Sequence, residues 1–416
     1  MEALELWFDF SCPYAYLASQ KAPGIARAAG VPLDWKPMLL GGVFRGIGAG
    51  DGPMPTLGPA KAAHNLADMQ RWAKVFGVPL NVPAAHPMRT VRALRTLLGL
   101  PHSRWPQAIT AIYAAYWQRN EDITRDEVIA ATLADIPEAP AALANADSDA
   151  IKAELRARTD EAIGHGIFGA PAWRVRGQLI WGQDRMPWVE AALAGWNLQG
   201  PPPGGVRPFG TGVEAFTGGR PIEMFFDVAS PFAYFALTQV PALARLTGSA
   251  ITMTPILLGG LFRDIGQVDV PLLAMPEAKR RYVGMEMKRW SDWWGVPFDM
   301  PSKFPQRSIA AQRLLTIPES FADRSRLAIA IASTMWARQQ SIEDPATLAQ
   351  ILSHEGFPAE WLDRTNDPSV KQQLIANTAR AKDRGVFGVP TFVIGDELVW
   401  GQDRLDLVLR YAGGWT

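Results

Sequence analysis

Cysteine is almost absent from this sequence of 416 residues, in which Cys12 stands alone. One thiol cannot form a disulfide within its own chain, and it cannot supply a cysteine-rich metal site. The five histidines show neither HxH nor HxxxH spacing, so the sequence contains no metal-binding motif. We therefore expect a protein that holds no metal ion.

An excess of either charge is also lacking, as are long apolar runs. Lysine and arginine together number 41, and so do aspartate and glutamate, so no net charge favours nucleic acid or an anionic membrane. No stretch approaches the roughly 18 apolar residues of a membrane-spanning helix. The first residues carry glutamates where a secretory signal carries basic residues, and Asp9 interrupts the apolar run. We expect a cytoplasmic protein that binds a small-molecule substrate and neither nucleic acid nor a membrane.

The chain is long enough for two domains, and it contains an internal repeat. Single cores usually divide above about 250–300 residues. The repeated segments, at an offset of 218 residues and then of 219, are 8–16 with 226–234, 37–45 with 255–263, 166–171 with 385–390, and 181–185 with 400–404. So long a match in register indicates a tandem duplication.

A segment rich in proline and glycine separates the two copies. It includes the run Gly-Pro-Pro-Pro-Gly-Gly, and such a composition is typical of a linker. We therefore place the first repeat at residues 1–199, the linker at 200–220 and the second repeat at 221–416.

Each copy shows the same order of predicted elements. Short apolar runs predict a strand at 4–10 and 222–228, and a second strand at 32–39 and 250–257. About a hundred residues with helical spacing follow, then a β-hairpin at 172–181 and 391–400 and a last helix. The pattern predicts an α/β protein of two tandem thioredoxin-like domains, each with a helical insertion.

Cys12 and Ser230 occupy the chemically most informative position of each copy. Both follow the first strand and stand directly before a proline, which is tolerated in the first turn of a helix. The free N–H groups and the dipole of a helix N-terminus stabilise an anion such as a thiolate.

Several motifs together resemble a known family. They are Ser-Pro-Phe-Ala-Tyr after Phe-Asp, Pro-x-Leu-Leu-Gly-Gly-x-Phe, Gly-Val-Phe-Gly-Val-Pro-Thr-Phe and Trp-Gly-Gln-Asp-Arg. In combination they resemble the 2-hydroxychromene-2-carboxylate isomerases and kappa-class glutathione transferases, which have a DsbA-like thioredoxin fold. The resemblance covers both copies. It implies that glutathione is the cofactor, and that Ser230 donates a hydrogen bond to the glutathione sulfur and favours the thiolate.

The same resemblance implies further glutathione-binding residues. Residues before and at a cis-proline would face the cysteinyl unit, a Gln-Asp pair would hold the γ-glutamyl end, and a lysine would meet a carboxylate. In this sequence they are Val389, Pro390, Gln402, Asp403 and Lys279 in the second copy, and Ala170, Pro171, Gln183, Asp184 and Lys61 in the first.

The first copy departs from this pattern, because Cys12 replaces the serine and no second cysteine is present to resolve a disulfide. Three interpretations remain open. Cys12 does the work of serine as a weaker donor, it forms a mixed disulfide with glutathione, or the first site has lost catalysis and is structural.

The implied function is that of a glutathione-dependent cis-trans isomerase acting on an aromatic or unsaturated keto acid, as in aromatic catabolism. One alternative is a DsbA-like thiol-disulfide oxidoreductase or glutathione transferase that uses Cys12. A second is a non-catalytic binding scaffold. Because relatives are homodimers of one such domain, we expect the two repeats to form an internal pseudo-dimer.

Overall fold

The computed structural model describes residues 2–50, 52, 57–268 and 270–416. The chain forms two compact units, which we describe separately. Unit 1 comprises Met1–Leu57, Leu66–Leu198 and Pro276–Tyr282. Unit 2 comprises Gly58–Asn65, Gln199–Met275 and Val283–Thr416. Each unit thus includes a short segment from the other copy of the repeat.

Each unit contains one four-stranded mixed sheet. The strand orders are β2-β1-β3-β4 and β6-β5-β7-β8, with one parallel pair and two antiparallel pairs in each sheet. The strands are β1 (Leu4–Phe8), β2 (Leu33–Pro37), β3 (Ala172–Val175) and β4 (Gln178–Trp181), and β5 (Ile222–Phe226), β6 (Ile251–Pro255), β7 (Thr391–Ile394) and β8 (Glu397–Trp400). The predicted strands and hairpins are confirmed, with ends that shift by up to two residues.

The central strands are buried because their residues are apolar on both faces. Leu6, Trp7 and Phe8 of β1 and Phe225 and Phe226 of β5 are all 0% exposed. Such continuous apolar runs are typical of a strand that has neighbours on both sides and helices over both faces. The core therefore lies around the strand that leads directly to Cys12 or Ser230.

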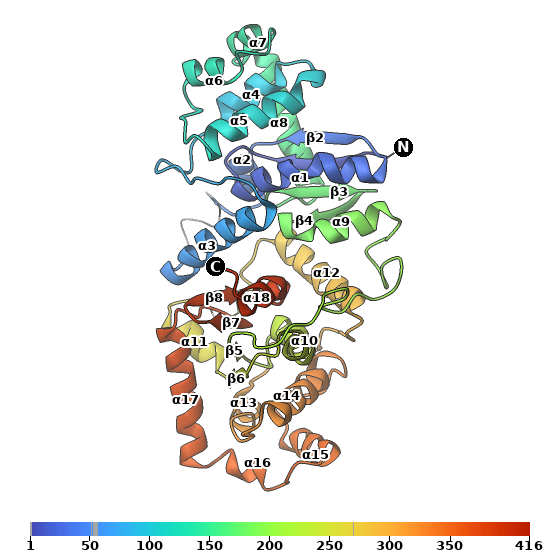
Figure 1. Ribbon diagram of the computed structural model, residues 1–416, viewed down its shortest axis with the longest axis vertical. Coiled ribbons are helices and arrows are strands. Elements are labelled where there is room, and N and C mark those ends of the chain that lie inside the picture. Colours follow the sequence, from blue (N-terminus) through green and yellow to red (C-terminus); the bar gives the residue numbers. More distant parts are fainter. Residues whose placement is uncertain (1, 51, 53–56, 269) are drawn as a thin grey trace. The chain divides into compact units, whose positions relative to one another are not determined.

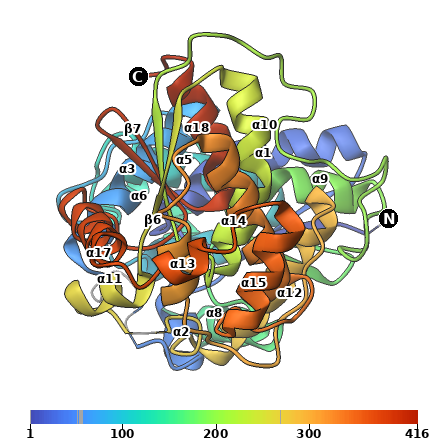
Figure 2. The same cartoon turned by 90° about the horizontal axis from the view of Figure 1, so that it is seen from below.

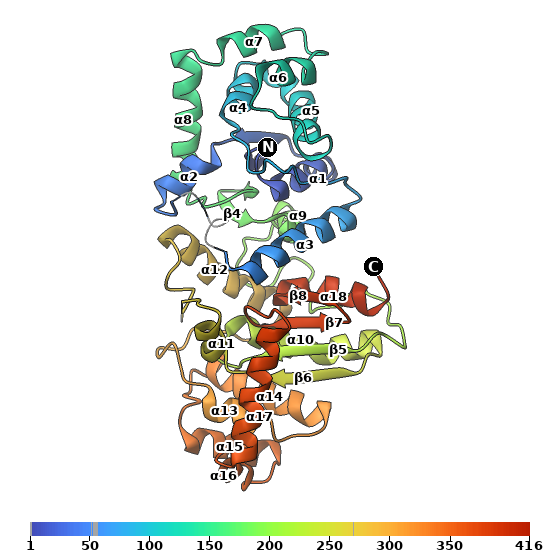
Figure 3. The ribbon, with the colours of Figure 1, turned by 90° about the vertical axis from the view of Figure 1, so that its left-hand side faces the viewer.

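The helices of the first copy include the predicted helical insertion. They are α1 (Pro13–Ala29), α2 (Leu40–Gly46), α3 (Pro59–Phe76), α4 (Val91–Leu98), α5 (Trp105–Trp117), α6 (Asp126–Thr132), α7 (Ala139–Asn145), α8 (Asp149–Gly164) and α9 (Met186–Leu193), with 3₁₀ turns η2 (His102–Arg104) and η3 (Gln183–Arg185). Figures 1 and 3 show α4 to α7 beyond the β2 edge of the sheet, away from β4.

The second copy repeats this arrangement. Its helices are α10 (Pro231–Thr247), α11 (Leu258–Asp264), α12 (Glu277–Trp294), α13 (Ile309–Leu314), α14 (Phe321–Trp336), α15 (Pro345–Glu355), α16 (Trp361–Arg364), α17 (Pro368–Asp383) and α18 (Leu405–Ala412), with the 3₁₀ turn η4 (Gln402–Arg404). Helices α13 to α16 lie beyond β6 in Figures 1 and 3, and α14 and α15 run side by side in Figure 2. The prediction of two thioredoxin-like domains with helical insertions is confirmed.

Residues 200–220 contain no helix or strand, and they belong to unit 2. The Gly200 N–H donates to Asp292, the Phe216 N–H to the Leu246 carbonyl and the Arg220 N–H to the Ala412 carbonyl. This segment is therefore tied to the second copy by its backbone. In the described part of the chain no helix has the length and apolar character that crossing a membrane requires.

Candidate active sites

Cys12 and Ser230 are the N-cap residues of α1 and α10. Their backbones are extended and nearly the same, with φ −94° and ψ 114° at Cys12 and φ −95° and ψ 125° at Ser230. The following proline fits the first helical turn, where its missing N–H costs no hydrogen bond. Both side chains therefore lie at the equivalent place in their copies, at the positive end of a helix.

The residue before a cis-proline contacts each of these side chains. The peptide bonds Ala170-Pro171 and Val389-Pro390 are both cis. The Cys12 thiol donates to the Ala170 carbonyl oxygen at 3.1 Å, and the Ser230 hydroxyl lies 3.4 Å from the Val389 carbonyl oxygen. The fold thus brings together residues that are 158 and 159 positions apart in the sequence.

The two sites differ in where the proton of the key side chain goes. The Ser230 hydroxyl accepts the Ala233 N–H at 3.3 Å, and its own proton has only the long contact to Val389. Cys12 is 7% exposed and its thiol is committed to the Ala170 carbonyl. Burial raises the pKa of the Cys12 thiol to about 12, and the neighbouring Asp9 carboxyl adds to the shift. Cys12 is therefore a neutral thiol near pH 7.

This burial predicts an unreactive cysteine. At pH 7.5 we expect Cys12 in the folded chain to react with 5,5′-dithiobis(2-nitrobenzoic acid) about a hundredfold more slowly than in urea, because the thiolate is the nucleophile. The release of thionitrobenzoate under both conditions measures the ratio. Equal rates would mean that the site holds an accessible thiolate.

A buried aspartate behind each site was not assigned a role from the sequence. Asp227 is 1% exposed, and it accepts hydrogen bonds from the Ala229 N–H at 3.0 Å, the Leu258 N–H at 2.9 Å and the Ser308 hydroxyl at 3.0 Å. It therefore joins the loop before Ser230 to the start of α11 and to the residue before α13. Burial raises its pKa, although these hydrogen bonds act in the opposite direction.

Asp9 makes the equivalent contacts in the first copy. It accepts from the Ser11 N–H at 3.0 Å, the Leu40 N–H at 2.7 Å and the Thr90 hydroxyl at 2.6 Å. The same Phe-Asp pair at the same offset in both copies was the sequence signal for this network. From the sequence alone, an aspartate at the end of a strand indicates only a polar turn, because its hydrogen-bond partners lie far away in the chain.

The Gln-Asp pairs lie in the 3₁₀ turns that lead into the last helix of each copy. Gln402 is buried, and the Asp403 carboxylate lies 3.1 Å from the Arg404 guanidinium. Gly401 precedes them with φ +111°, which a residue with a Cβ atom rarely adopts, and a Cβ there would meet Asp403 at 2.4 Å. The first copy repeats this with Gln183 and Asp184, whose carboxylate lies 2.8 Å from Arg185.

The two lysines lie in the compact units of the opposite copies. Lys61 belongs to unit 2, where its amine is 5.2 Å from the centre of the Trp400 ring. Lys279 belongs to unit 1, where its amine is 5.5 Å from the Trp181 ring. From the sequence we expected each lysine to serve the site of its own copy. The structure instead brings Lys61 to the strand that ends two residues before Gln402.

A second residue of α3 reaches the same tryptophan in unit 2. The backbone N–H of Trp400 donates to His64 Nε2 at 3.2 Å, whereas in unit 1 the backbone N–H of Trp181 donates to the Tyr282 hydroxyl at 2.8 Å. Burial lowers the pKa of Lys61, and this lysine has no ion pair within the described ranges. The environment of Trp400 therefore contains a partly desolvated cation that forms no ion pair with the described side chains.

The family model of the DSBA-like thioredoxin domain matches residues 3–194 and again residues 221–412. This chain belongs to the DSBA-like thioredoxin family. The double match within this DSBA-like chain also confirms the tandem duplication that the repeated motifs predicted.

Characterised relatives of this DSBA-like chain match about half of its length. It is 29% identical to the 2-hydroxychromene-2-carboxylate isomerase of Sphingobium xenophagum over 194 residues, which are 46% of this chain and 98% of that protein. It is 26% identical to human glutathione S-transferase kappa 1 over 212 residues, 47% of this chain and 91% of that protein. The predicted resemblance to these two groups of enzymes is confirmed.

The match to a solved structure of a 2-hydroxychromene-2-carboxylate isomerase covers 46% of this chain and 94% of that structure's chain, with 24% identity and a TM-score of 0.43.

Within the described residues, no group of three or more His, Cys, Asp or Glu side chains is arranged to hold a metal ion.

Proposed function

We propose that this chain is a glutathione-dependent isomerase of the 2-hydroxychromene-2-carboxylate isomerase type, and that Ser230 serves its working site. The observation that carries the proposal is the different use of the proton in the two sites. The Ser230 hydroxyl accepts a backbone N–H and holds its own proton in a contact of 3.4 Å. That proton is available to a sulfur anion, whereas the Cys12 proton is held by a carbonyl at 3.1 Å.

The residues around Ser230 fit glutathione. The Val389 N–H and carbonyl form no backbone hydrogen bond within the described residues, so they can pair with the peptide of a bound tripeptide. Lys61 supplies a cation for a carboxylate, and Gln402 and Asp403 present an amide and a carboxylate for the γ-glutamyl end. When bound, glutathione supplies the nucleophilic thiol, which the chain lacks at this site.

The protein's part is to favour the ionised thiol and to fix its position. Two effects favour an anion beside Ser230: the hydrogen bond from its hydroxyl and the positive end of α10. Asp227 holds the loop that presents Ser230, through the Ala229 and Leu258 N–H groups. Burial of Ser230, which is 5% exposed, strengthens both interactions by excluding water.

We propose an aromatic or unsaturated keto acid as the substrate. A carbon–carbon double bond conjugated to a carbonyl accepts a sulfur nucleophile and releases it again, which permits rotation about that bond. The match to an isomerase over 98% of that relative's length supports this substrate class.

Turnover of 2-hydroxychromene-2-carboxylate tests the proposal. We expect its absorbance change to be accelerated by the purified chain only when reduced glutathione is present. Oxidised glutathione is the matched control, because it has no thiol. Equal turnover without any thiol would contradict the proposal, and glutathione-dependent reduction of a disulfide substrate without isomerisation would favour the redox alternative.

Lys61 gives a specific prediction. Replacing Lys61 with alanine should weaken glutathione binding at the Ser230 site by about 10- to 100-fold, because a hydrogen bond to a charged group contributes about 1.5–3 kcal/mol. Isothermal titration of the Cys12→Ala background measures the affinity. Lys21→Ala is the control, since Lys21 donates to the Phe76 carbonyl in unit 1. An unchanged affinity would remove Lys61 from the site.

We also propose that the two repeats form the internal pseudo-dimer expected from the sequence. The inclusion of Gly58–Asn65 in unit 2 and of Pro276–Tyr282 in unit 1 supports it. Relaxation measurements should then give a single tumbling time for a particle of 45.5 kDa. Two independent, shorter times would contradict the pseudo-dimer.

A further inference from the structure

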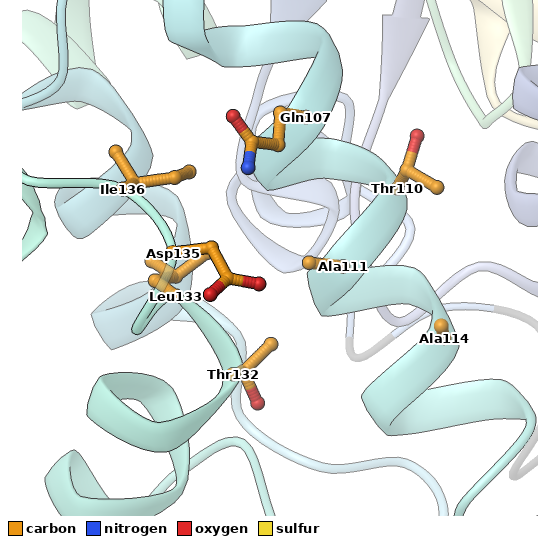
Figure 4. Close-up of a pocket in the computed structure, with 8 residues that line it drawn as sticks. All are labelled: Gln107, Thr110, Ala111, Ala114, Thr132, Leu133, Asp135 and Ile136. Atoms are coloured by element: carbon orange, nitrogen blue, oxygen red, sulfur yellow. The ribbon is translucent and has the colours of Figure 1, made fainter.

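The helical insertion of each copy lines a cleft, and the two clefts lie at equivalent places. In the first copy it lies between α5 and the end of α6 and measures about 390 Å³ (Figure 4). In the second copy it lies between α10, α14 and α15 and measures about 550 Å³. The offset of 219 residues that relates Trp117 to Trp336, at the ends of α5 and α14, also relates the linings of the two clefts.

The two linings carry different charges. Gln107 of the first cleft corresponds to Arg326 of the second, and Asp135 corresponds to His354. Figure 4 shows the Gln107 amide on one helix and the Asp135 carboxylate on the segment opposite it. The duplication has therefore given the first cleft one carboxylate and the second two arginines, a histidine and a glutamate.

The charged side chains of the second cleft are only partly paired with one another. Arg338 donates to the Ala330 carbonyl and the Thr334 hydroxyl, both neutral, and forms no ion pair within the described ranges. His354 forms none there either. Arg326 lies 3.3 Å from the Asp323 carboxylate, and Glu355 adds one negative charge to the lining.

A buried hydroxyl in the lining lacks a partner. Ser325 is 4% exposed, and its Oγ has no hydrogen-bond partner among the described residues. Buried polar atoms in folded proteins are nearly always paired, so an unpaired one in a cleft lining points to a ligand. The first copy has Pro106 at the equivalent position and so lacks this hydroxyl.

We propose that this cleft of the second copy binds a small aromatic carboxylate. Arg338, Arg326 and the Ser325 hydroxyl offer donors to the carboxylate, while Phe321, Ile329 and Pro241 form an apolar wall for the ring. Its volume lies in the range of small-molecule sites, about 300–1,000 Å³. Pro241 is eleven residues along α10 from Ser230, about 16 Å at 1.5 Å per residue, so this end of the cleft is separate from the Ser230 site.

Titration with 2-naphthoate tests the proposal on the full chain. We expect saturable binding, weakened about tenfold or more by Arg338→Gln. Arg119→Gln is the matched control, because Arg119 is the equivalent residue of the first copy and pairs with Glu121 at 2.9 Å. The neutral 2-naphthylmethanol should bind at least about tenfold more weakly, since it lacks the carboxylate. Equal effects of the two arginine variants would overturn the proposal.

The proposal for this cleft does not depend on the function proposed for the Ser230 site. A methyl resonance distinguishes binding in the cleft from binding at Ser230. The Ile329 δ1 methyl lines the cleft, and its shift should move saturably with 2-naphthoate. No movement of this resonance, with heat of binding still present, would place the ligand elsewhere and overturn the proposal. Arg326→Gln, which restores the residue of the first copy, repeats the test should Arg338→Gln fail to fold.

Discussion

Replacement of Ser230 by alanine is expected to lower glutathione-dependent isomerisation by about 100- to 1,000-fold in kcat, the range observed when one donor to a developing anion is removed. The variant loses the only side-chain hydroxyl at the start of α10 that both accepts the Ala233 N–H and offers a proton outward. Initial rates with saturating glutathione and varied substrate measure kcat and KM separately.

The equivalent change in the first copy is the matched control. Cys12→Ala should change kcat by less than about threefold, because a thiol that burial keeps neutral gives little stabilisation to an anion. A large loss on Cys12→Ala with an intact Ser230→Ala enzyme would move the working site to the first copy. A loss of the same size in both variants would mean that both sites act.

Replacement of Asp227 by asparagine is expected to lower the free energy of unfolding by about 2–4 kcal/mol. Three donors converge on this carboxylate, and an asparagine offers one oxygen to them and turns its own NH₂ group toward another donor. Urea unfolding followed by circular dichroism measures the difference. Asp264→Asn, at an aspartate that is 42% exposed, should stay within about 0.5 kcal/mol of the wild type.

The pH dependence of that difference follows from the pKa shift. Burial raises the pKa of Asp227 above its usual value of 3.8, so the folded state binds the proton more tightly than the unfolded state. The contribution of this group to stability is then fully present below the unfolded pKa and is lost as the pH rises through the folded pKa. The difference in free energy of unfolding between wild type and Asp227→Asn should therefore narrow as the pH rises from the unfolded pKa to the folded pKa. A gap that widens would show that the hydrogen bonds outweigh burial.

The fold could be predicted from the sequence because its signals are local. The apolar runs of β1 and β5, the proline after Cys12 and Ser230, and the hairpin that ends at Trp181 or Trp400 each depend on a few neighbouring residues. Repetition of each signal at a fixed offset then supported the whole order of elements.

Site residues could be placed from the sequence only where a local motif fixes their position next to a strand or helix. The approach of Ser230 to Val389 could be expected, because Ser230 follows β5, Val389 precedes β7, and these two strands pair in the thioredoxin-like sheet. The assignment of Lys61 to unit 2 could not, since no periodicity indicates which sheet the start of a helix joins. The sequence left the state of Cys12 open among three interpretations, because that state depends on burial by residues far away in the chain.

The segments that each unit takes from the other copy bear on how the two sites can evolve. In an assembly of identical chains, one gene position would have to serve both tryptophans. Here His64 accompanies Trp400 and Tyr282 accompanies Trp181, so a mutation of His64 alters the environment of Trp400 and not that of Trp181. Because the two copies are encoded by separate stretches of one gene, they can diverge independently. Each site can then acquire its own ligand preference while the other site keeps its sequence.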